Sequence, residues 1–232
     1  MKKFALIVAG GSGSRMNNAV PKQFIEINDR PVLMHTFDAF FKFGSKLEFI
    51  LVLPKDQVNV WNALCQKHRF KTEHKITFGG ETRFQSVKNG LDLISDDGIV
   101  FIHDGVRPLV SAKTLKNCFE KAAGKGNALP VVPVTESVRF ADGSENHPVD
   151  RSKYFLVQTP QTFQTRLIKN AYGLAKTDVF TDDATVLESM GERIHLVEGN
   201  RENIKITYPE DLVFAEILLK QKKTAEKFPI PL

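Results

Sequence analysis

Four short runs of consecutive apolar residues mark the first half of the chain, at positions 4–9, 49–53, 99–103 and 129–134. Uninterrupted runs of this length predict strands that are buried on both faces of a sheet. The stretches between them carry apolar residues three and four positions apart, which predicts helices. This alternation predicts an α/β, Rossmann-like fold, with a mostly parallel twisted sheet and helices on both faces. The apolar positions of the predicted helices are Val32, Leu33, Phe37, Phe40 and Phe41; Val58, Trp61, Leu64 and Cys65; Phe84, Val87, Leu91 and Ile94; and Leu115, Phe119 and Ala122.

The pattern changes over residues 135–157, where two polar, partly alternating segments flank Ala141-Asp142-Gly143-Ser144. Such a turn between alternating segments predicts a β-hairpin. The segments have too little apolar surface to fold alone. We therefore expect a protruding dimerisation arm that packs on a second copy of the chain, giving a homodimer.

Regular patterns resume after the arm. We expect helices at 167–175 and 182–190, strands at 194–197 and 203–207, and a last helix that starts near Pro209, a residue suited to a first helical position. The tail, residues 228–232, is expected to be loose. No linker or repeat divides the chain, so residues 1–232 are predicted to form a single domain with the arm as its one extension.

Composition narrows the class of protein. The chain has 232 residues, of which 42% are hydrophobic, enough for a substantial core. No apolar run approaches the roughly 20 residues that cross a bilayer, and the apolar start is too short for a signal peptide. We therefore expect a cytoplasmic protein without membrane contact. Cys65 and Cys118 lack a paired spacing and are expected to be buried thiols.

The net charge of +5 suits an anionic ligand such as a nucleotide or a phosphate ester. Basic residues are not interleaved with aromatic ones, so no nucleic-acid partner is expected. The six histidines show no metal-site spacing.

A glycine-rich stretch follows the first predicted strand directly. It reads Ala9-Gly10-Gly11-Ser12-Gly13-Ser14-Arg15-Met16, and Pro21-Lys22-Gln23-Phe24 comes shortly after it. Glycines let the main chain turn sharply and bring its N–H groups against phosphate oxygens. In open α/β sheets ligands bind at the carboxyl ends of the strands, where this stretch lies. Arg15 and Lys22 add two positive charges there, so we predict a phosphate-binding loop.

Two common phosphate-binding loops do not fit this stretch. A Walker A loop needs Gly-Lys followed by Ser or Thr, whereas Gly13 precedes Ser14-Arg15. The dinucleotide fingerprint needs a third glycine, and Met16 stands at that position. The stretch instead resembles the signature of sugar-phosphate nucleotidylyltransferases. More narrowly, it is similar to that of the 2-C-methyl-D-erythritol 4-phosphate cytidylyltransferases of non-mevalonate isoprenoid synthesis.

The resemblance extends through most of the chain and implies a set of nucleotide contacts. Ala9, Gly10, Gly11 and Gly13 would contact the phosphates. Residues 79–87, Gly-Gly-Glu-Thr-Arg-Phe-Gln-Ser-Val, resemble the segment that holds cytosine through the backbone of Gly80 and the hydroxyl of Ser86. A tight turn and a helix start would explain the same segment without a ligand.

His103-Asp104-Gly105-Val106-Arg107-Pro108 ends a predicted buried strand. The resemblance places Asp104 and Gly105 near the ribose and Arg107 near the acceptor, although the family usually has two alanines where this chain has Gly105 and Val106. An ion pair between Asp104 and Arg107 is the structural alternative. His103 is expected to be a packed strand residue.

Three further segments resemble acceptor-side motifs of the family. Val149-Asp150-Arg151 and Gln158-Thr159-Pro160-Gln161-Thr162-Phe163 resemble the return strand of its dimerisation arm and the motif after it. The resemblance implies that Arg151 grips the acceptor's phosphate, a task that suits a planar guanidinium. Arg151 could instead pair with Glu136 or Asp150.

Ser137, where the family often has threonine, Thr159, Thr181 and Asp182 would also contact the acceptor. One residue of Thr181-Asp182-Asp183-Ala184 is expected to cap a helix. Lys205 interrupts the apolar stretch 203–207, where an unpaired ammonium would be costly. By resemblance, Lys205 binds the α-phosphate of CTP.

The implied reaction is attack of the acceptor's phosphate oxygen on the α-phosphorus of CTP, with release of pyrophosphate. An ionised phosphate needs no general base, so positioning and charge neutralisation carry the catalysis. Arg15 and Lys22 would stabilise the transition state and pyrophosphate, and Lys205 and Arg151 would hold the α-phosphate and the acceptor. The expected cofactor is Mg²⁺, held mainly by the CTP phosphates and water rather than by protein side chains.

Alternative functions stay open at this point. A ribitol-5-phosphate cytidylyltransferase shares the loop, the fold and the donor, but tends to differ around the arm's return strand. A non-catalytic CTP-binding module would have no use for Arg151, Thr181 and Lys205. A nicotinamide dehydrogenase fails on the missing glycine and on the lack of an acid near the second strand.

Overall fold

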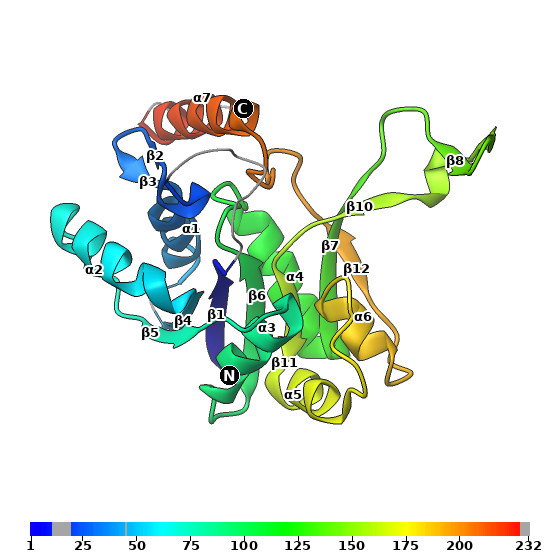
Figure 1. Ribbon diagram of the computed structural model, residues 1–232, viewed down its shortest axis with the longest axis horizontal. Helices are drawn as coiled ribbons and strands as arrows, with labels where there is room; N and C mark the ends of the chain where they lie inside the picture. The colour runs from blue at the N-terminus through cyan, green and yellow to red at the C-terminus, as the bar shows by residue number, and fades with distance from the viewer. Residues whose placement is uncertain (11–19, 45, 228–232) are drawn as a thin grey trace.

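An eight-stranded sheet forms the centre of the protein (Figure 1). The computed structural model describes residues 1–10, 20–44 and 46–227. Within them the sheet order is β10-β7-β11-β6-β1-β4-β5, and β12 pairs with β7. These strands are β1 (Lys2–Val8), β4 (Leu47–Leu53), β5 (Lys75–Phe78), β6 (Gly98–Asp104), β7 (Asn127–Pro133), β10 (Phe155–Val157), β11 (Gln161–Gln164) and β12 (Leu196–Glu198).

The sheet is mostly parallel, as predicted. Strand β1 pairs in parallel with both β4 and β6, β4 with β5, and β7 with β12. The exceptions are β11, which runs antiparallel between β6 and β7, and β10, which runs antiparallel on β7. The four predicted apolar runs form β1, β4, β6 and β7, because residues buried on both faces need no polar alternation.

Seven α-helices are described, and six of them cover the two faces of the sheet. They are α1 (Val32–Phe41), α2 (Val58–Lys67), α3 (Arg83–Asp92), α4 (Ala112–Lys125), α5 (Thr165–Leu174), α6 (Asp183–Glu188) and α7 (Pro209–Lys227). Alternate residues of β1 face opposite ways, so Ala5 and Ile7 pack with α1, α2 and α4, whereas Phe4 and Leu6 pack with α3, α5 and α6. The prediction of helices on both faces is confirmed.

The helix α7 covers a smaller apolar cluster at the carboxyl ends of the strands. Ala215 and Leu219 of α7 pack with Val106 and Ile206. The same cluster includes Ile27 of the short strand β2 (Glu26–Ile27), which pairs with β3 (Arg30–Pro31). Figure 1 shows α7 above these strands. The helix therefore fixes the loop after β6 and residues 203–207 against the body.

The prediction of a strand at residues 203–207 is wrong. This segment has no regular secondary structure, although Asn203 and Ile206 are buried. A main-chain hydrogen bond from the Ile206 N–H to the Val106 carbonyl at 3.0 Å ties it to the loop after β6. Burial beneath α7, and not a sheet ladder, explains its apolar composition.

A two-stranded hairpin occupies the predicted arm segment. Strands β8 (Arg139–Asp142) and β9 (Glu145–Pro148) pair antiparallel around the turn at Gly143. Figure 1 shows this hairpin standing away from the sheet. All eight of its strand residues are exposed, so within one copy of the chain nothing covers it. Its role in dimerisation stays a prediction.

Both cysteines are free thiols. Cys118 is fully buried, as predicted, and Cys65 is only partly buried. Burial raises the pKa of Cys118 to about 12 and that of Cys65 to about 11. Neither thiol is therefore ionised near neutral pH, and both act as small apolar side chains.

Candidate active site

The glycine-rich stretch begins where β1 leaves the sheet. The Ala9 N–H donates to the Val52 carbonyl at 2.9 Å, and the Ala9 carbonyl accepts from the Gln23 amide at 3.0 Å. Gln23 thus ties the start of the stretch to the Pro-Lys-Gln-Phe segment. The predicted phosphate contacts Gly11, Gly13 and Arg15 lie outside the described residues.

Strand β6 ends close to the same point. The Gly105 N–H donates to the Val8 carbonyl at 2.8 Å. A Cβ atom on Gly105 would lie only 2.9 Å from the Cβ of Ala9. Glycine at this position therefore lets the ends of β1 and β6 approach each other without a side chain between them.

The segment predicted to hold the nucleobase lies beside Gly10. The Ser86 hydroxyl accepts from the Gly80 N–H at 3.0 Å and donates to the Thr82 carbonyl at 3.0 Å. A Cβ on Gly79 would meet the Ser86 oxygen at 3.2 Å and the Gly10 Cα at 3.9 Å. Gly10, Gly79 and Gly80 therefore form one glycine-rich edge, which the buried hydroxyl of Ser86 supports.

Asp104, the last residue of β6, is the centre of the charged part of the site. One oxygen of its nearly buried carboxylate accepts from Arg107 Nε at 3.0 Å and lies 3.2 Å from Lys205 Nζ. Burial alone would raise the pKa of Asp104. The cations Lys205 and Arg107, with more distant Arg83, outweigh it and hold that pKa well below its ordinary range. The Asp104–Arg107 ion pair considered from the sequence is present.

Two buried side chains, those of Thr159 and His103, hold the main chain of Asp104 in place. The Thr159 hydroxyl accepts from the Asp104 N–H at 3.1 Å and lies 3.0 Å from Nδ1 of His103. Burial lowers the pKa of His103 to about 4, so the ring is neutral at pH 7. Its Nε2 lies 3.0 Å from the Arg107 carbonyl and must donate, so Nδ1 accepts from Thr159. His103 is a packed strand residue, as predicted, and Thr159 supports Asp104.

Lys22 contacts the segment that carries Lys205. Its side chain is nearly buried, and its ammonium donates to the Ile206 carbonyl at 3.0 Å. The neighbouring Lys205 pairs with Asp104, so one short segment joins both lysines to the end of β6. The costly burial of the Lys205 ammonium considered from the sequence does not arise, because Lys205 lies in an irregular loop with its side chain 42% exposed and pairs with Asp104.

The residues predicted to face the acceptor divide into three places. Asp182 caps α6, accepting from the Thr185 N–H at 2.9 Å, and also accepts from the Gln161 amide at 2.8 Å. The expected helix cap in this motif is thus Asp182, and Thr181 precedes it in an exposed position. Arg107 lies beside Asp104 and also donates to the Asn203 carbonyl at 2.8 Å.

Arg151 and Ser137 lie on the arm segment. Arg151 donates to the Thr135 carbonyl rather than pairing with Glu136 or Asp150, so neither alternative partner considered from the sequence is used. Both residues are exposed. Ser137 precedes β8 and Arg151 follows β9, and Figure 1 shows this arm leaving the body past β10.

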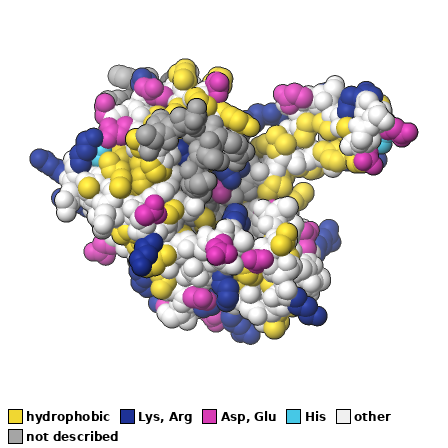
Figure 2. Space-filling view, viewed as in Figure 1, with side chains coloured by type: hydrophobic (Ala, Val, Ile, Leu, Met, Phe, Trp, Pro, Cys, Tyr) yellow, Lys and Arg dark blue, Asp and Glu magenta, His cyan; other side chains and the backbone are white. Residues whose placement is uncertain are grey.

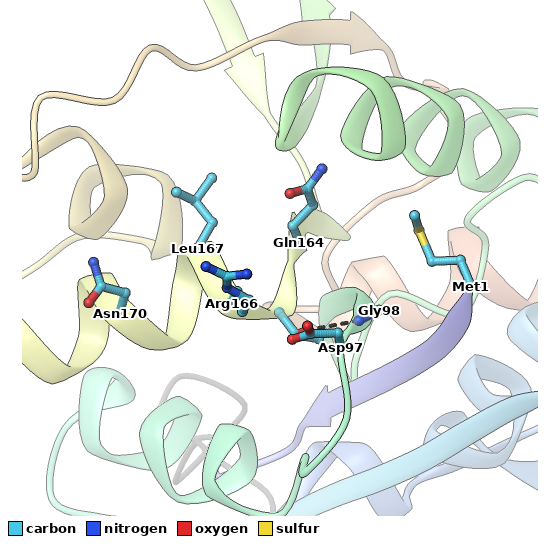
Figure 3. Close-up of a pocket in the computed structure, with 8 residues that line it drawn as sticks. Met1, Asp97, Gly98, Gln164, Arg166, Leu167 and Asn170 are labelled. Carbon is cyan, nitrogen blue, oxygen red and sulfur yellow. Dashed lines mark hydrogen bonds between the residues drawn. The ribbon is translucent and has the colours of Figure 1, made fainter.

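No group of three or more His, Cys, Asp or Glu side chains close enough to hold a metal ion occurs among the described residues. Over the same residues, no helix is both long and apolar enough to cross a membrane. A hollow of about 820 Å³ lies at the amino end of β6, lined by Gly98, Arg166 and Asn170 among others (Figure 3). It contains none of the predicted site residues and lies at the wrong ends of the strands for a ligand of this fold.

Sequence reasoning gave no role to several residues that organise the site. Gln161 links β11 to α6 through Asp182 and the Ala184 N–H. Arg83 forms a two-pronged ion pair with buried Asp183. A signal was available for Asp183, because two adjacent aspartates follow Thr181 and only one of them can cap the helix.

The chain is similar over nearly its whole length to known proteins of one family. A family model described as 2-C-methyl-D-erythritol 4-phosphate cytidylyltransferase matches residues 4–221. Proteins of that name from Bacteroides thetaiotaomicron and Bacteroides fragilis are 50% and 52% identical over 219 residues, covering 94% of this chain and 100% of each relative.

Solved structures agree as well. The crystal structure of the enzyme of that name from Thermus thermophilus is 31% identical with a TM-score of 0.76, over 95% of this chain and 100% of that one. The 4-diphosphocytidyl-2C-methyl-D-erythritol synthase of Anaerococcus prevotii is 28% identical with a TM-score of 0.80, over 94% and 99%.

Proposed function

The chain belongs to the family of 2-C-methyl-D-erythritol 4-phosphate cytidylyltransferases, and from that premise we propose what its site does. The enzyme transfers the cytidylyl group of CTP to 2-C-methyl-D-erythritol 4-phosphate and releases pyrophosphate. This is a step of isoprenoid precursor synthesis by the non-mevalonate route. A non-catalytic CTP-binding module and a nicotinamide dehydrogenase do not fit this family.

One observation carries the assignment of the site. Lys205 and Arg107 both contact the carboxylate of Asp104, and Lys22 donates to the Ile206 carbonyl, next to Lys205 in the chain. This place adjoins the glycine-rich edge at Gly10, Gly79 and Gly80, which Ser86 supports. Basic side chains beside a glycine-rich edge suit a nucleoside triphosphate, with the phosphates on the cations and the base on the edge.

The chemistry asks for charge stabilisation and alignment. The acceptor's phosphate oxygen attacks the α-phosphorus in line with the leaving pyrophosphate, and the ionised nucleophile needs no base. Lys205 would hold the α-phosphate. Lys22, together with Arg15 of the glycine-rich loop, would stabilise the transition state and the leaving pyrophosphate, while Arg151 would hold the acceptor's phosphate.

Asp104 gives Lys205 a defined position before the nucleotide binds. The ammonium is half-exposed and held by one ion pair, so it can turn from the carboxylate to a phosphate oxygen at small cost. Asp104 keeps Arg107 when this happens, because that pair is shielded from solvent on both sides. The carboxylate thus remains balanced while Lys205 changes partner.

We also propose that Mg²⁺ accompanies the triphosphate. Asp104 already holds two cations, so the described residues suit a metal that is bound mainly through phosphate oxygens and water. Mg²⁺ bound in this way would neutralise phosphate charge. The enzyme is proposed to work in the cytoplasm, where CTP is made.

Pyrophosphate release tests the function directly. With CTP and Mg²⁺, we expect release in the presence of 2-C-methyl-D-erythritol 4-phosphate, none with ribitol 5-phosphate, and none once the metal is chelated by EDTA. Release with ribitol 5-phosphate alone would reassign the acceptor. Equal release with Mg²⁺ and with EDTA would remove the metal from the proposal. Silence with both acceptors would overturn the proposed activity.

The arm supports a homodimer as the working form. It presents the exposed aromatic side chain of Phe140, and β10 at its base presents Phe155 and Leu156. Figure 2 shows hydrophobic side chains on the part of the arm nearer the body, with charged side chains at its tip. An isolated hairpin is marginally stable in water, and a contiguous apolar surface of this kind is typical of an interface between copies. Two-fold pairing through the arms would cover it.

Phe140→Asp is expected to convert the dimer to a monomer, because a charge would replace a 53% exposed aromatic side chain in the proposed interface. Size-exclusion chromatography with light scattering at micromolar concentration would measure the mass. The matched control is Leu174→Asp, which places the same charge at a 56% exposed position at the end of α5 and should leave the dimer intact. A monomeric parent, or a dimeric Phe140→Asp variant, would contradict this interface.

A further inference from the structure

A buried ion pair connects the nucleotide side of the site to its acceptor side. Arg83, the first residue of α3, donates from Nη1 and Nη2 to the two carboxylate oxygens of Asp183 at 2.6 and 2.7 Å. Asp183 is the first residue of α6 and is fully buried. The contact therefore joins the starts of two helices that lie 100 residues apart in the chain.

The surroundings make this pair rigid. The Tyr172 hydroxyl donates to the same carboxylate at 2.7 Å from α5. Phe84 stacks on Tyr172 with ring centroids 4.5 Å apart and on Phe180 at 5.6 Å. A two-pronged guanidinium–carboxylate contact fixes orientation as well as distance, and the carboxylate of Asp183 is fully buried.

A second contact ties the same two regions together. Asp178, in the loop before α6, accepts from the Gln85 amide at 3.1 Å and from the Thr82 hydroxyl at 3.4 Å. Thr82 caps α3, and its carbonyl accepts from the Ser86 hydroxyl. The loop that leads to Thr181 is thus held against the segment predicted to bind the base.

Each end of this connection reaches a different substrate. The α3 end carries Gly80 and Ser86, assigned to the nucleotide, and the α6 end carries Thr181 and Asp182, assigned to the acceptor. In-line transfer needs the acceptor's oxygen and the α-phosphorus in a near-attack geometry, and a displacement of about 1 Å can cost 10²-fold in rate. A rigid tie between the two half-sites would set that separation.

We propose that the Arg83–Asp183 pair is a positioning device for the transfer reaction, which rests on the function proposed above. Neither residue needs to touch a substrate. The pair acts by holding the nucleotide-binding segment 79–86 and the acceptor-binding residues Thr181 and Asp182 at a fixed separation. Each half-site binds its own substrate without the pair, but the two bound substrates lose their alignment.

The test compares variants by kcat and by CTP affinity. Asp183→Asn and Arg83→Gln are each expected to lower kcat about 30-fold, while the Kd of CTP measured by calorimetry without acceptor changes less than about threefold. The double variant should lose no more than either single one, because both break the same contact. Arg83→Lys keeps the positive charge but lacks the planar guanidinium that binds both carboxylate oxygens. Its kcat should therefore lie between those of Arg83→Gln and the parent.

Two further variants separate positioning from stability. Tyr172→Phe removes a hydrogen bond to the same carboxylate but leaves the ion pair, so it should lower Tm while kcat stays within about twofold. Asp178→Ala removes the second tie at a half-buried position and should lower kcat about fivefold in a folded protein. This variant keeps the test valid if Asp183→Asn does not fold.

The outcomes are distinguishable. An inactive parent would overturn the proposed function. An active parent whose Asp183→Asn and Asp178→Ala variants keep their full kcat would overturn the positioning role. A loss of kcat in Tyr172→Phe equal to that in Asp183→Asn, at matched loss of Tm, would reduce the pair to a purely structural contact.

Discussion

Replacing Lys22 with alanine is expected to lower kcat by about 10³ while the protein stays folded. The ammonium is nearly buried at the carboxyl ends of the strands and is held by the Ile206 carbonyl. It is therefore a preorganised charge beside the position assigned to the phosphates. Losing such a donor removes stabilisation from the transition state and leaves the apolar core untouched. Steady-state pyrophosphate release would measure kcat, and circular dichroism would follow folding.

A matched control exists elsewhere in the molecule. Lys169 of α5 also donates to a main-chain carbonyl, that of Ile94, at 2.6 Å, but at the amino side of the sheet. Lys169→Ala should keep kcat within about twofold, because its contact serves packing alone. If Lys22→Ala retained turnover within about tenfold of the parent, the assigned role of Lys22 would be wrong.

Asp104→Asn is expected to damage both stability and turnover. The substitution keeps the shape of the side chain but leaves Arg107, whose side chain is nearly buried, without its counter-charge. Removing one partner of a buried pair typically costs 3–5 kcal/mol, and we expect about 3 kcal/mol in the free energy of unfolding, because Lys205 can turn to solvent. Since Asp104 also orients Lys205 and Arg107 for substrate, kcat should fall about 10²-fold.

Urea denaturation would give the change in unfolding free energy, and kcat would be measured below the denaturation range. The control is Asp96→Asn, which breaks an exposed ion pair with Lys2 of 2.7 Å and should leave the unfolding free energy and kcat nearly unchanged, because water screens the pair. An Asp104→Asn variant as stable as the Asp96→Asn control would show that the carboxylate at the end of β6 carries no structural charge balance.

Much of the fold follows from patterns within single segments. The run at 99–103 is apolar because β6 is covered on both faces, and the helical spacing of Phe37 and Phe40 matches the face that α1 buries. These signals are local, so they are legible without knowledge of the partner elements. The same holds for Pro209 at the start of α7.

The differences arise where distant contacts decide the structure. Residues 203–207 have strand-like composition, but α7 covers Ile206 and the hydrogen bonds of the segment form no ladder with a neighbouring strand. β11 is too short to show a period, and only its two antiparallel neighbours make it a strand. Periodicity in a segment cannot report such neighbours.

The candidate site shows the same limit. Motif residues such as Asp104, Lys22 and Lys205 could be named from the sequence, and the structure brings them together. Their connections could not be named. The pairing of Arg83 with Asp183 depends on the crossing of α3 and α6, which only the assembled fold sets.

The position of β11 in the sheet differs from its position in the order of synthesis. Residues 161–164 lie between β6 and β7, yet both of those neighbours are synthesised earlier. A nascent chain that ends before residue 161 carries two strands whose facing edges have no partner, and unpaired edges invite pairing with other chains. The sheet can therefore join β6 to β7 only after the four-residue strand β11 has been synthesised.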